Sequence, residues 1–579
     1  LVTVTAARDA TVNTSGVLQL GSLTASRDAT LTAAGQVSQA SALTVGRHLS
    51  ATSTAGAITL QDSANTVGGS VAASGSQVDL RTSGDLQLAN VTSTGSFSAQ
   101  SGGHVTQAVG TQLTITGSTT LTVDSSHDVL LGNSGNALGS SVSVSQTRDL
   151  TLNSGTALQL GATTVSRNAI LTAVGDISQS SAWSIGGTTQ ATSTTGKVLL
   201  SQAGNTLTGQ VSASGTDVSL RSSGDLLLDQ VTAAGALTLQ SGGHITQQAG
   251  SVLSATGNTT VTTDTSHDVS LDKTANQLVG SVAATGRQVT LGNGLATLLG
   301  SVQASQGLTV NSTGSVTQQG VTTLQVGTDL NVQATGGSSS VTLTHANTVG
   351  GQVTLGAGAN VNYSTSGAAQ MGAVTAGGNL SLVAGGAVTQ SADWQVTGTT
   401  QVQATGADVT LNRAGNQLGG AVTLTGRHLD IRDSSALVLG HVTATGNLTL
   451  QAAGISQQNA SNFSVAGTSV LSADSTHDIS MNQAGNVWGG SVSVTSARDV
   501  SLRSSAGLAT GAITAQRDLT LTAAGDVSQS GVWSVQGTTT VNAGSGQVSL
   551  NQSGNALTGA LSITGGAVDV SSTSALLLG

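Results

Sequence analysis

Residues 205–228 read NTLTGQVSASGTDVSLRSSGDLLL, and the chain continues with VTAAGALTLQSGGHITQ at 231–247 and LSATGNTTVTTDTSHDVSL at 253–271. In each stretch apolar residues alternate with Ser, Thr or other polar residues, and Gly, Asn and Ser separate the alternating runs. Alternation of period two is typical of strands that bury one face, and Gly and Asn suit tight turns. The segment therefore predicts short β-strands joined by tight corners.

Copies of this segment recur along the chain about every 70 residues. Each copy carries an Asn in an N-x-[LVW]-x-G-like phrase and a [VI]-[ST]-Q triplet. The Asn residues are Asn65, Asn136, Asn205, Asn276, Asn347, Asn416, Asn486 and Asn555. The triplets end at Gln39, Gln107, Gln179, Gln247, Gln318, Gln390, Gln457 and Gln529. Such a period is typical of an array in which each unit contacts mainly its neighbours.

The expected fold is all-β: a right-handed parallel β-helix, or solenoid, with about three coils in each repeat. Each of the three stretches in 205–275 supplies three short strands, enough to close one coil. The longest interval, from Leu253 to Val282, predicts an extra loop on the third coil, and this loop holds the repeated Asn. We expect one continuous β-helix with partial repeats at both ends and complete repeats between them, at 1–64, 65–135, 136–204, 205–275, 276–346, 347–415, 416–485, 486–554 and 555–579.

We interpret the repeated Asn as a turn residue, since Asn tolerates left-handed backbone and bonds its own main chain. An amide ladder needs neighbours about 4.8 Å apart, whereas this Asn recurs only every third coil. Contact with a ligand is the remaining alternative.

Large side chains share one position, about 22 residues before the repeated Asn, and other repeats have Leu there. This exchange predicts a core position and disfavours the alternative, a row of exposed aromatics that stack on sugars. Trp488 and Tyr363 fall outside the position, and we expect them at the surface. The aromatic residues at the position are Trp183, Trp394, Trp533 and Phe463.

The composition excludes several functional classes. The 579 residues include no Pro and no Cys, only 7% are charged, and the net charge is −10. No basic run could follow phosphates, which argues against nucleic acid, and the absence of Cys excludes disulfides and thiolate metal sites. No stretch reaches the roughly 18 apolar residues of a membrane-spanning helix. Because the chain starts at Leu1 inside a repeat, we expect it to be a segment of a longer protein.

The sharpest candidate for chemistry is a column of Asp and His. Asp225, His244 and Asp268 each precede a strand of successive coils, and Asp85, His104 and Asp128 have the same spacing. Stacking in register would place each imidazole between two carboxylates. One interpretation is an exposed polar corner; the other is a cation site completed by His127 and His267.

Another repeat carries Ala157, Asp176 and Lys197 at the corresponding positions, which favours the corner. We therefore assign no catalytic, cofactor-binding or metal residues and expect no cofactor. We also expect that the protein is not an enzyme, since a carbohydrate-active β-helix needs clustered carboxylates in a groove.

Phrases such as AGNQLGGAVTLTG (414–426) and DLTLTAAGDVSQSGVWSVQGTTTV (518–541) resemble the repeats of filamentous haemagglutinin-like proteins, the exoproteins of bacterial two-partner secretion. The resemblance covers essentially the whole chain. It implies the repeat shaft of an adhesin or contact-dependent inhibition protein, secreted to the cell surface by an outer-membrane transporter. The family's N-terminal secretion domain and any C-terminal effector would lie outside this segment.

The expected function is a structural and adhesive stalk that projects a distal binding or effector region. The expected partners are that transporter and a host or neighbouring-cell receptor or glycan, with no nucleic acid and no membrane-spanning segment. The alternatives are a carbohydrate-active β-helix enzyme and a passive surface or matrix lattice protein.

Overall fold

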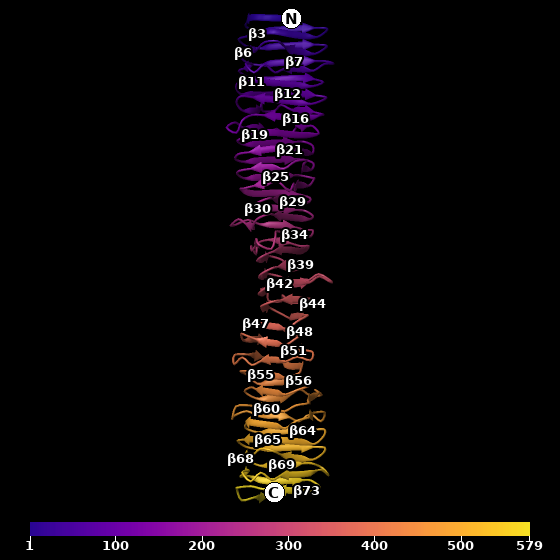
Figure 1. Ribbon diagram of the computed structural model, residues 1–579, viewed down its shortest axis with the longest axis vertical. Helices are drawn as coiled ribbons and strands as arrows, with labels where there is room; N and C mark the ends of the chain where they lie inside the picture. The colour runs from indigo at the N-terminus through magenta and orange to yellow at the C-terminus, as the bar shows by residue number, and fades with distance from the viewer. The chain divides into compact units, whose positions relative to one another are not determined.

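The computed structural model describes residues 1–579, which form 74 strands and no helix. The chain divides into unit 1, Leu1–Gly292, and unit 2, Asn293–Gly579. In each unit the chain passes back and forth between two parallel sheets, and successive passes stack like rungs (Figure 1). The predicted all-β solenoid is therefore confirmed, with about 29 turns in all. No helix has the length and hydropathy of a membrane span.

The residues of one repeat of unit 1 form nine strands in two sheets. Sheet B receives β10, β12, β14, β15, β17 and β18, whereas sheet A receives β11, β13 and β16. The bounds are β10 Ser70–Gly75, β11 Val78–Thr82, β12 Leu86–Ser93, β13 Phe97–Ser101, β14 Val105–Gln107, β15 Leu113–Ile115, β16 Ser118–Thr122, β17 Val129–Leu131 and β18 Ala137–Leu138.

The strands of the next repeat occupy the opposite sheets. Its first strand, β19, lies in sheet A beside β16, and the strands that match β14, β15, β17 and β18 also lie in sheet A. The bounds are β19 Ser141–Thr147, β20 Leu150–Ser154, β21 Leu158–Val165, β22 Ala169–Ala173, β23 Ile177–Gln179, β24 Trp183–Ile185, β25 Thr189–Ser193, β26 Val198–Leu200 and β27 Thr206–Leu207.

This exchange of sheets follows from the number of passes in a repeat. The passes of one repeat run B, A, B, A, B, A and B, because β14 with β15, and β17 with β18, share a pass. Seven passes are three and a half coils, so consecutive repeats are related by a half-turn. The prediction of about three coils is confirmed, and the strand register refines it.

Two details of the predicted coil are wrong. Each coil has two sides rather than three, since the alternating runs separated by Gly or Ser belong to only two sheets. The long third coil is absent as well, because Leu253 lies in sheet B and its strand pairs 23 residues on, through Ala255 and Leu278. Val282 pairs with Thr259 in the other sheet, so the interval to Val282 spans more than one coil.

The predicted core position is confirmed. Trp183, Trp394, Trp533 and Phe463 are at most 1% exposed. The expectation for Trp488 and Tyr363 is wrong: both are buried, and the Trp488 ring lies 4.4 Å from the Phe463 ring. Tyr363 occupies an inward position of β46 (Val361–Thr365), where burial raises the pKa of its phenol to about 12.

One sheet of each repeat opens in the middle and closes again. In β12 one extra residue between Leu88 and Val91 bulges out, and the next pass splits into β14 and β15 around a loop at 108–112. The following pass splits into β17 and β18 around a turn at 132–136, after which β20 is continuous. We call these two connections the mid-sheet loops.

Candidate functional site

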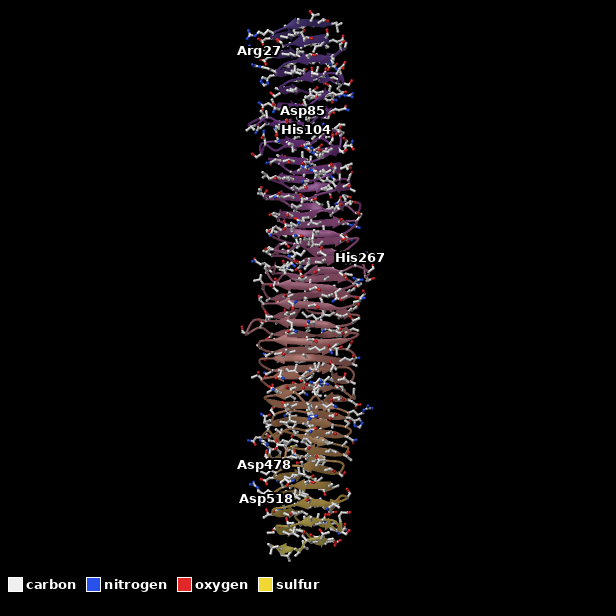
Figure 2. The ribbon with its side chains drawn as sticks, turned by 90° about the vertical axis from the view of Figure 1, so that its left-hand side faces the viewer. Arg27, Asp85, His104, His267, Asp478 and Asp518 are labelled. Atoms are coloured by element: carbon white, nitrogen blue, oxygen red, sulfur yellow. The ribbon has the colours of Figure 1, made fainter.

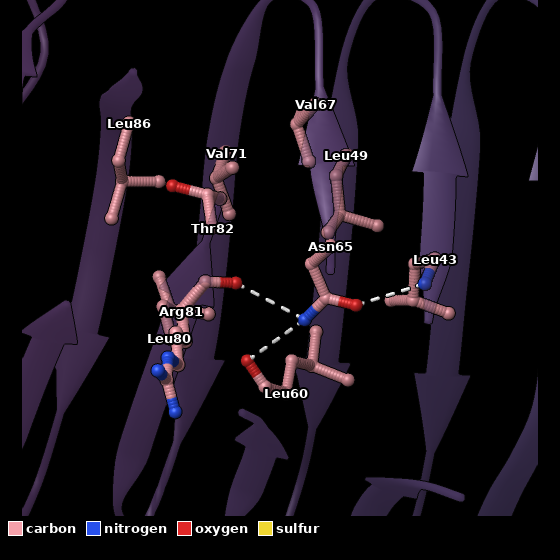
Figure 3. A pocket seen from close by; sticks show the side chains of 10 residues that line it. All are labelled: Leu43, Leu49, Leu60, Asn65, Val67, Val71, Leu80, Arg81, Thr82 and Leu86. Atoms are coloured by element: carbon pink, nitrogen blue, oxygen red, sulfur yellow. Dashed lines mark hydrogen bonds between the residues drawn. The ribbon is translucent and has the colours of Figure 1, made fainter. Parts of the chain in front are cut away.

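The repeated Asn fills the gap that the mid-sheet loops leave in the ladder. The Oδ1 atom of Asn65 accepts hydrogen bonds from the Leu43 N–H at 2.8 Å and from Gln39 Nε2 at 2.8 Å. Its Nδ2 donates to the Leu60 and Arg81 carbonyls at 3.3 and 3.1 Å (Figure 3) and to Gln39 Oε1 at 2.9 Å. One buried amide therefore replaces the ladder bonds that broken strands cannot make.

The pair of Asn and Gln recurs in all eight copies, because the Gln that ends the [VI]-[ST]-Q triplet bonds the repeated Asn in both directions. The Gln Nε2 to Asn Oδ1 distances run from 2.5 to 3.1 Å. Every one of these Asn residues is at most 2% exposed. The two sequence marks are thus the two halves of a single structural feature.

The interpretation of Asn as a turn residue is half correct. The N–H of Asn65 does close a turn, since it donates to the Asp62 carbonyl at 3.2 Å. Its side chain, however, is buried and holds neighbouring passes together. The void beside Asn65 holds only about 10 Å³ among Leu43, Leu60 and Leu80, too little for any ligand larger than one water.

The first mid-sheet loop has two lengths. The short form has three residues, as at 40–42, and the long form has five, as at 108–112. With one further residue after the loop, the spacing from Gln to Asn rises from 26, as in Gln39 and Asn65, to 29, as in Gln107 and Asn136. The long form closes a turn in which the fourth residue donates its hydroxyl to the first carbonyl at 2.7 Å. The third residue has positive φ in every case: Gly110, Gly250, Val321 and Ala460.

The two loop lengths are segregated by sheet within each unit. In unit 1 the long form follows β14 and β32 (Ile245–Gln247) in sheet B, and the short form follows strands of sheet A. In unit 2 the long form follows β41 (Val316–Gln318) and β58 (Ile455–Gln457), which share one sheet, and the short form lies on the other. Each unit thus has one side with long loops and one side with short loops.

A shallow polar groove lies between the two mid-sheet loops of a long-form repeat. Its volume is about 480 Å³, and it is lined only by small or amide-bearing residues: Gly110, Thr111, Gln112, Gly132, Asn133, Ser134 and Gly135. The adjoining tip residue Val109 is 97% exposed. The groove offers hydrogen-bonding groups and no charged or nucleophilic pair.

Polar side chains at the corners form a second ladder along each unit. At the corner before a strand, an Asp, Asn or His accepts the backbone N–H of the residue one coil further on. Examples are Asp149 with Asn168, Asp176 with Lys197, and Asn360 with Asn379, at 3.1, 2.8 and 2.8 Å. These bonds occupy an N–H that lies outside the sheets at the corner.

The Asp and His column predicted from the sequence is part of this ladder. Asp85 accepts the His104 N–H at 2.8 Å, and His104 Nδ1 accepts the Asp128 N–H at 2.9 Å, so His104 bonds an aspartate on each side. Figure 2 shows Asp85 and His104 one above the other along the stack. The second copy repeats both bonds, from His244 to Asp225 and from Asp268 to His244, at 2.8 and 3.0 Å.

Asp128 is further held by an arginine from the next coil. Arg148 binds it with two hydrogen bonds, of 2.8 and 2.7 Å, and this contact lowers the pKa of the Asp128 carboxyl. The same bidentate pairing joins coils elsewhere, in Arg47 with Asp28, Arg167 with Asp149, Arg287 with Asp268, Arg427 with Asp408, Arg498 with Asp478 and Arg517 with Asp499. The Arg and Asp residues at the corners thus bind each other across coils.

His127 and His267 belong to a separate turn of sequence D-[ST]-[ST]-H-D, present at 124–128, 264–268 and 474–478. Asp124 Oδ1 accepts the Ser126 hydroxyl at 2.6 Å and lies 2.7 Å from His127 Nδ1. Hydrogen bonds from Ser126, then from His127, lower the pKa of Asp124 to about 2. Both side chains share one carboxylate oxygen, so this is not the relay of a hydrolase, in which Asp and Ser engage opposite ring nitrogens.

The residues suggested for a cation site do not gather into a set of metal ligands. The ring of His127 meets that of His104 edge to face at 5.1 Å, and His267 meets His244 in the same way. Both Nδ1 atoms already have partners, and no group of three or more His, Asp or Glu side chains has the geometry to hold a metal ion. The turn at 474–478 lacks the second His altogether, since Gly454 stands where His104 and His244 stand.

The signal for the column was visible in the sequence, whereas the pairing of Asn with Gln was missed. Both sequence marks are visible, but the Gln and the Asn stand 26 or 29 residues apart, which is more than one coil. Only the strand register shows that their side chains meet.

Comparisons with known proteins give one result. No curated protein and no solved structure matches the chain. A family model described as repeats of unknown function (DUF5649) matches eight consecutive segments: 7–74, 75–145, 147–214, 215–285, 286–356, 358–425, 426–495 and 497–564. These segments cover nearly all of the chain. The chain therefore belongs to this family of repeats of unknown function.

Proposed function

We propose that the chain is a stalk segment of a large secreted bacterial surface exoprotein, exported through an outer-membrane transporter. The stalk would hold a distal binding or effector region away from the cell. The observation that carries this proposal is the continuity of hydrogen bonding between coils, which the pair of Asn and Gln maintains where the mid-sheet loops interrupt the strands. Backbone ladders join the passes, and in all eight copies a buried Asn, bonded to a Gln in both directions, bridges the mid-sheet gap.

This construction favours stiffness and reach within each unit. Unit 1 has 292 residues, which at about 20 residues a coil and 4.8 Å between coils spans on the order of 70 Å. Backbone hydrogen bonds run along that axis, so bending would require many bonds to lengthen together. A repeat array can also gain length by adding copies without a new fold.

Adhesion is the second part of the proposal. The exposed groove between the mid-sheet loops at 108–112 and 132–136 offers Thr, Gln, Asn and Ser groups that suit hydrogen bonding to a glycan or to a receptor on a host or neighbouring cell. We propose no catalytic role, because the corner carboxylates that could perform acid–base chemistry are bound to arginines or backbone N–H groups. The resemblance to filamentous haemagglutinin-like repeats supports the secreted location.

The test is surface exposure and reach in the native organism. Antibodies against this chain should label intact cells, and loss of the outer-membrane transporter should abolish the labelling. Removal of residues 139–278, two repeats, should shorten the surface projection seen by electron cryotomography by roughly seven coils, about 34 Å. Labelling only after cell lysis, or a projection of unchanged length, would refute the proposal.

A further inference from the structure

Five of the nine histidines use their ring as an acceptor for the next coil. In each, Nδ1 accepts the backbone N–H of a residue 19 to 24 positions further on, at 2.9 to 3.2 Å. Four of these histidines occupy corners, and His441 occupies the bulge of β56 (Leu437–Ala444). The pairs are His48 with Ser70, His104 with Asp128, His244 with Asp268, His428 with Asn447 and His441 with Asn462.

These bonds exist only with neutral imidazole. Nδ1 accepts through a lone pair, so the ring proton must sit on Nε2. A protonated ring carries a proton on both nitrogens and has no acceptor left, so the N–H of the next coil would face another N–H. Imidazole takes up its second proton between about pH 8 and pH 5. Carbonyl acceptors on asparagine do not titrate in this range.

We propose that the five histidines are acid-sensitive fasteners: each neutral ring holds the backbone of the following coil, and protonation releases it. The chain thereby contains a switch that loosens selected corners and one bulge while the Asn-held corners stay closed.

The charged groups around His428 allow this release. In the preceding coil Asp408 accepts the N–H of His428 and is bound by Arg427, which lowers the pKa of Asp408 to about 2. In the following coil the facing residue is Asn447, which is uncharged. The proton taken up by His428 therefore finds a carboxylate that is already ionised and already engaged by arginine.

His104 has more neighbours and a second place for its proton. Asp85 accepts its backbone N–H from the preceding coil. From the following coil it meets Asp128, to which Arg148 is bound, and the ring of His127, which is bonded to Asp124. Asp128 Oδ2 lies 3.4 Å from His104 Nδ1, so a protonated ring can donate to this carboxylate instead of accepting the backbone N–H.

The neighbours of His244 correspond one for one: Asp225 before it, then Asp264, His267 and Asp268, with Arg287 beyond. At His48, Asp28 and Arg47 lie in contact, and Ser70 follows.

Three other histidines serve as an internal contrast. In His127, His267 and His477, Nδ1 faces a carboxylate at 2.7 Å, so that nitrogen already donates. A second proton on Nε2 leaves this bond intact and adds attraction to the same Asp. Acid should therefore loosen the five fasteners and not these three turns.

Matched controls are present in the chain. Asn447 holds the Thr468 N–H at 3.1 Å and Asn379 holds the Thr399 N–H at 2.8 Å, at corners like those of the histidines. Asn90 holds the Gln112 N–H at 2.8 Å in the bulge of β12, the place that His441 occupies in β56. The substitution His428→Asn therefore uses a residue that this fold already accepts at such a position.

The experiment is hydrogen exchange on the full chain at pH 7.5 and pH 5.0, corrected for the intrinsic exchange rates. The protection of the Asn447, Asn462 and Asp128 amides should fall by about fivefold at pH 5.0, as expected for loss of one partly exposed hydrogen bond. The Thr399, Thr468 and Gln112 amides should keep their protection.

His428→Asn should abolish the loss at Asn447, and His428→Ala should weaken Asn447 at both pH values. Equal protection at both pH values in the unmodified chain, or an undiminished acid loss in His428→Asn, would overturn the proposal.

Discussion

Replacement of Asn416 by Ala tests whether the buried amide holds the coils together. Asn416 is 0% exposed; it accepts the Trp394 N–H at 2.9 Å and donates to the Leu411 and Arg432 carbonyls at 3.1 and 3.0 Å. It also bonds the Gln390 amide in both directions. An alanine would leave all four partners without their bonds.

The size of the effect follows from how deeply these partners lie. The bonds to Trp394 and Leu411 are buried, and each group left unpaired there costs roughly 1–3 kcal/mol. The bonds to Arg432 and Gln390 are partly buried, so water can replace them at a cost of about 1 kcal/mol in total. The expected loss is therefore about 4 kcal/mol, a roughly thousandfold increase in local opening.

Hydrogen exchange read by mass spectrometry can measure this opening over peptides that span Val388–Leu418. Asn412→Ala is the matched control, since Asn412 lies in the same turn but is exposed and bonds only the Asp430 side chain. The control should change local opening less than threefold. If Asn416→Ala behaves like the control, the amide pair is not what closes the mid-sheet gap.

Three further predictions concern the loop tips, the corners and the repeat itself. Val321→Gly should raise local stability by about 1 kcal/mol in urea denaturation, because Val321 has φ of 57° and a β-branched residue is strained there; no gain would show that the strain is absent. Arg148→Gln removes the group that lowers the pKa of the corner aspartate before it. This pairing stabilises the fold above about pH 4 and is lost as pH falls below that, so the variant should unfold with less acid dependence below about pH 4. Removal of 139–207, a single repeat, should move the loop tip Ala249 to the opposite face from Val109. Spin labels on cysteines introduced at the two tips would report this, since the chain has no native Cys; both tips on one face would contradict the half-turn.

The solenoid could be predicted because its signal is local. Apolar residues at every second position mark the inward side of a strand without knowledge of any partner strand. Val218 with Leu220, and Leu226 with Leu228, are examples. The number of sheets could not be predicted in the same way. A Gly or Asn at a corner, at a bulge and at a mid-sheet loop has the same local preference, and only the strand register distinguishes these places.

The corner column was predictable for a related reason. Asp85, His104 and Asp128 each directly precede a strand whose first residue points inward, so the strand starts fixed their alignment. What the spacing could not reveal was the role of the ring. His104 could be placed between two carboxylates, but the backbone N–H that it accepts belongs to the conformation of the next corner.

Because each repeat has an odd number of passes, the order of long and short loops along the sequence decides which sheet carries each form. With an even number, every mid-sheet loop would lie on the same sheet, and the long and short forms would alternate along that one face. With seven passes, consecutive repeats face opposite sides, so the long form at Gln107 and again at Gln247 lies on one sheet of unit 1 and the short form on the other. A change of two residues in the first mid-sheet loop is therefore also a choice of side. The array can therefore lengthen by pairs of repeats, about seven coils and 34 Å, and keep the long loops on one sheet and the short loops on the other.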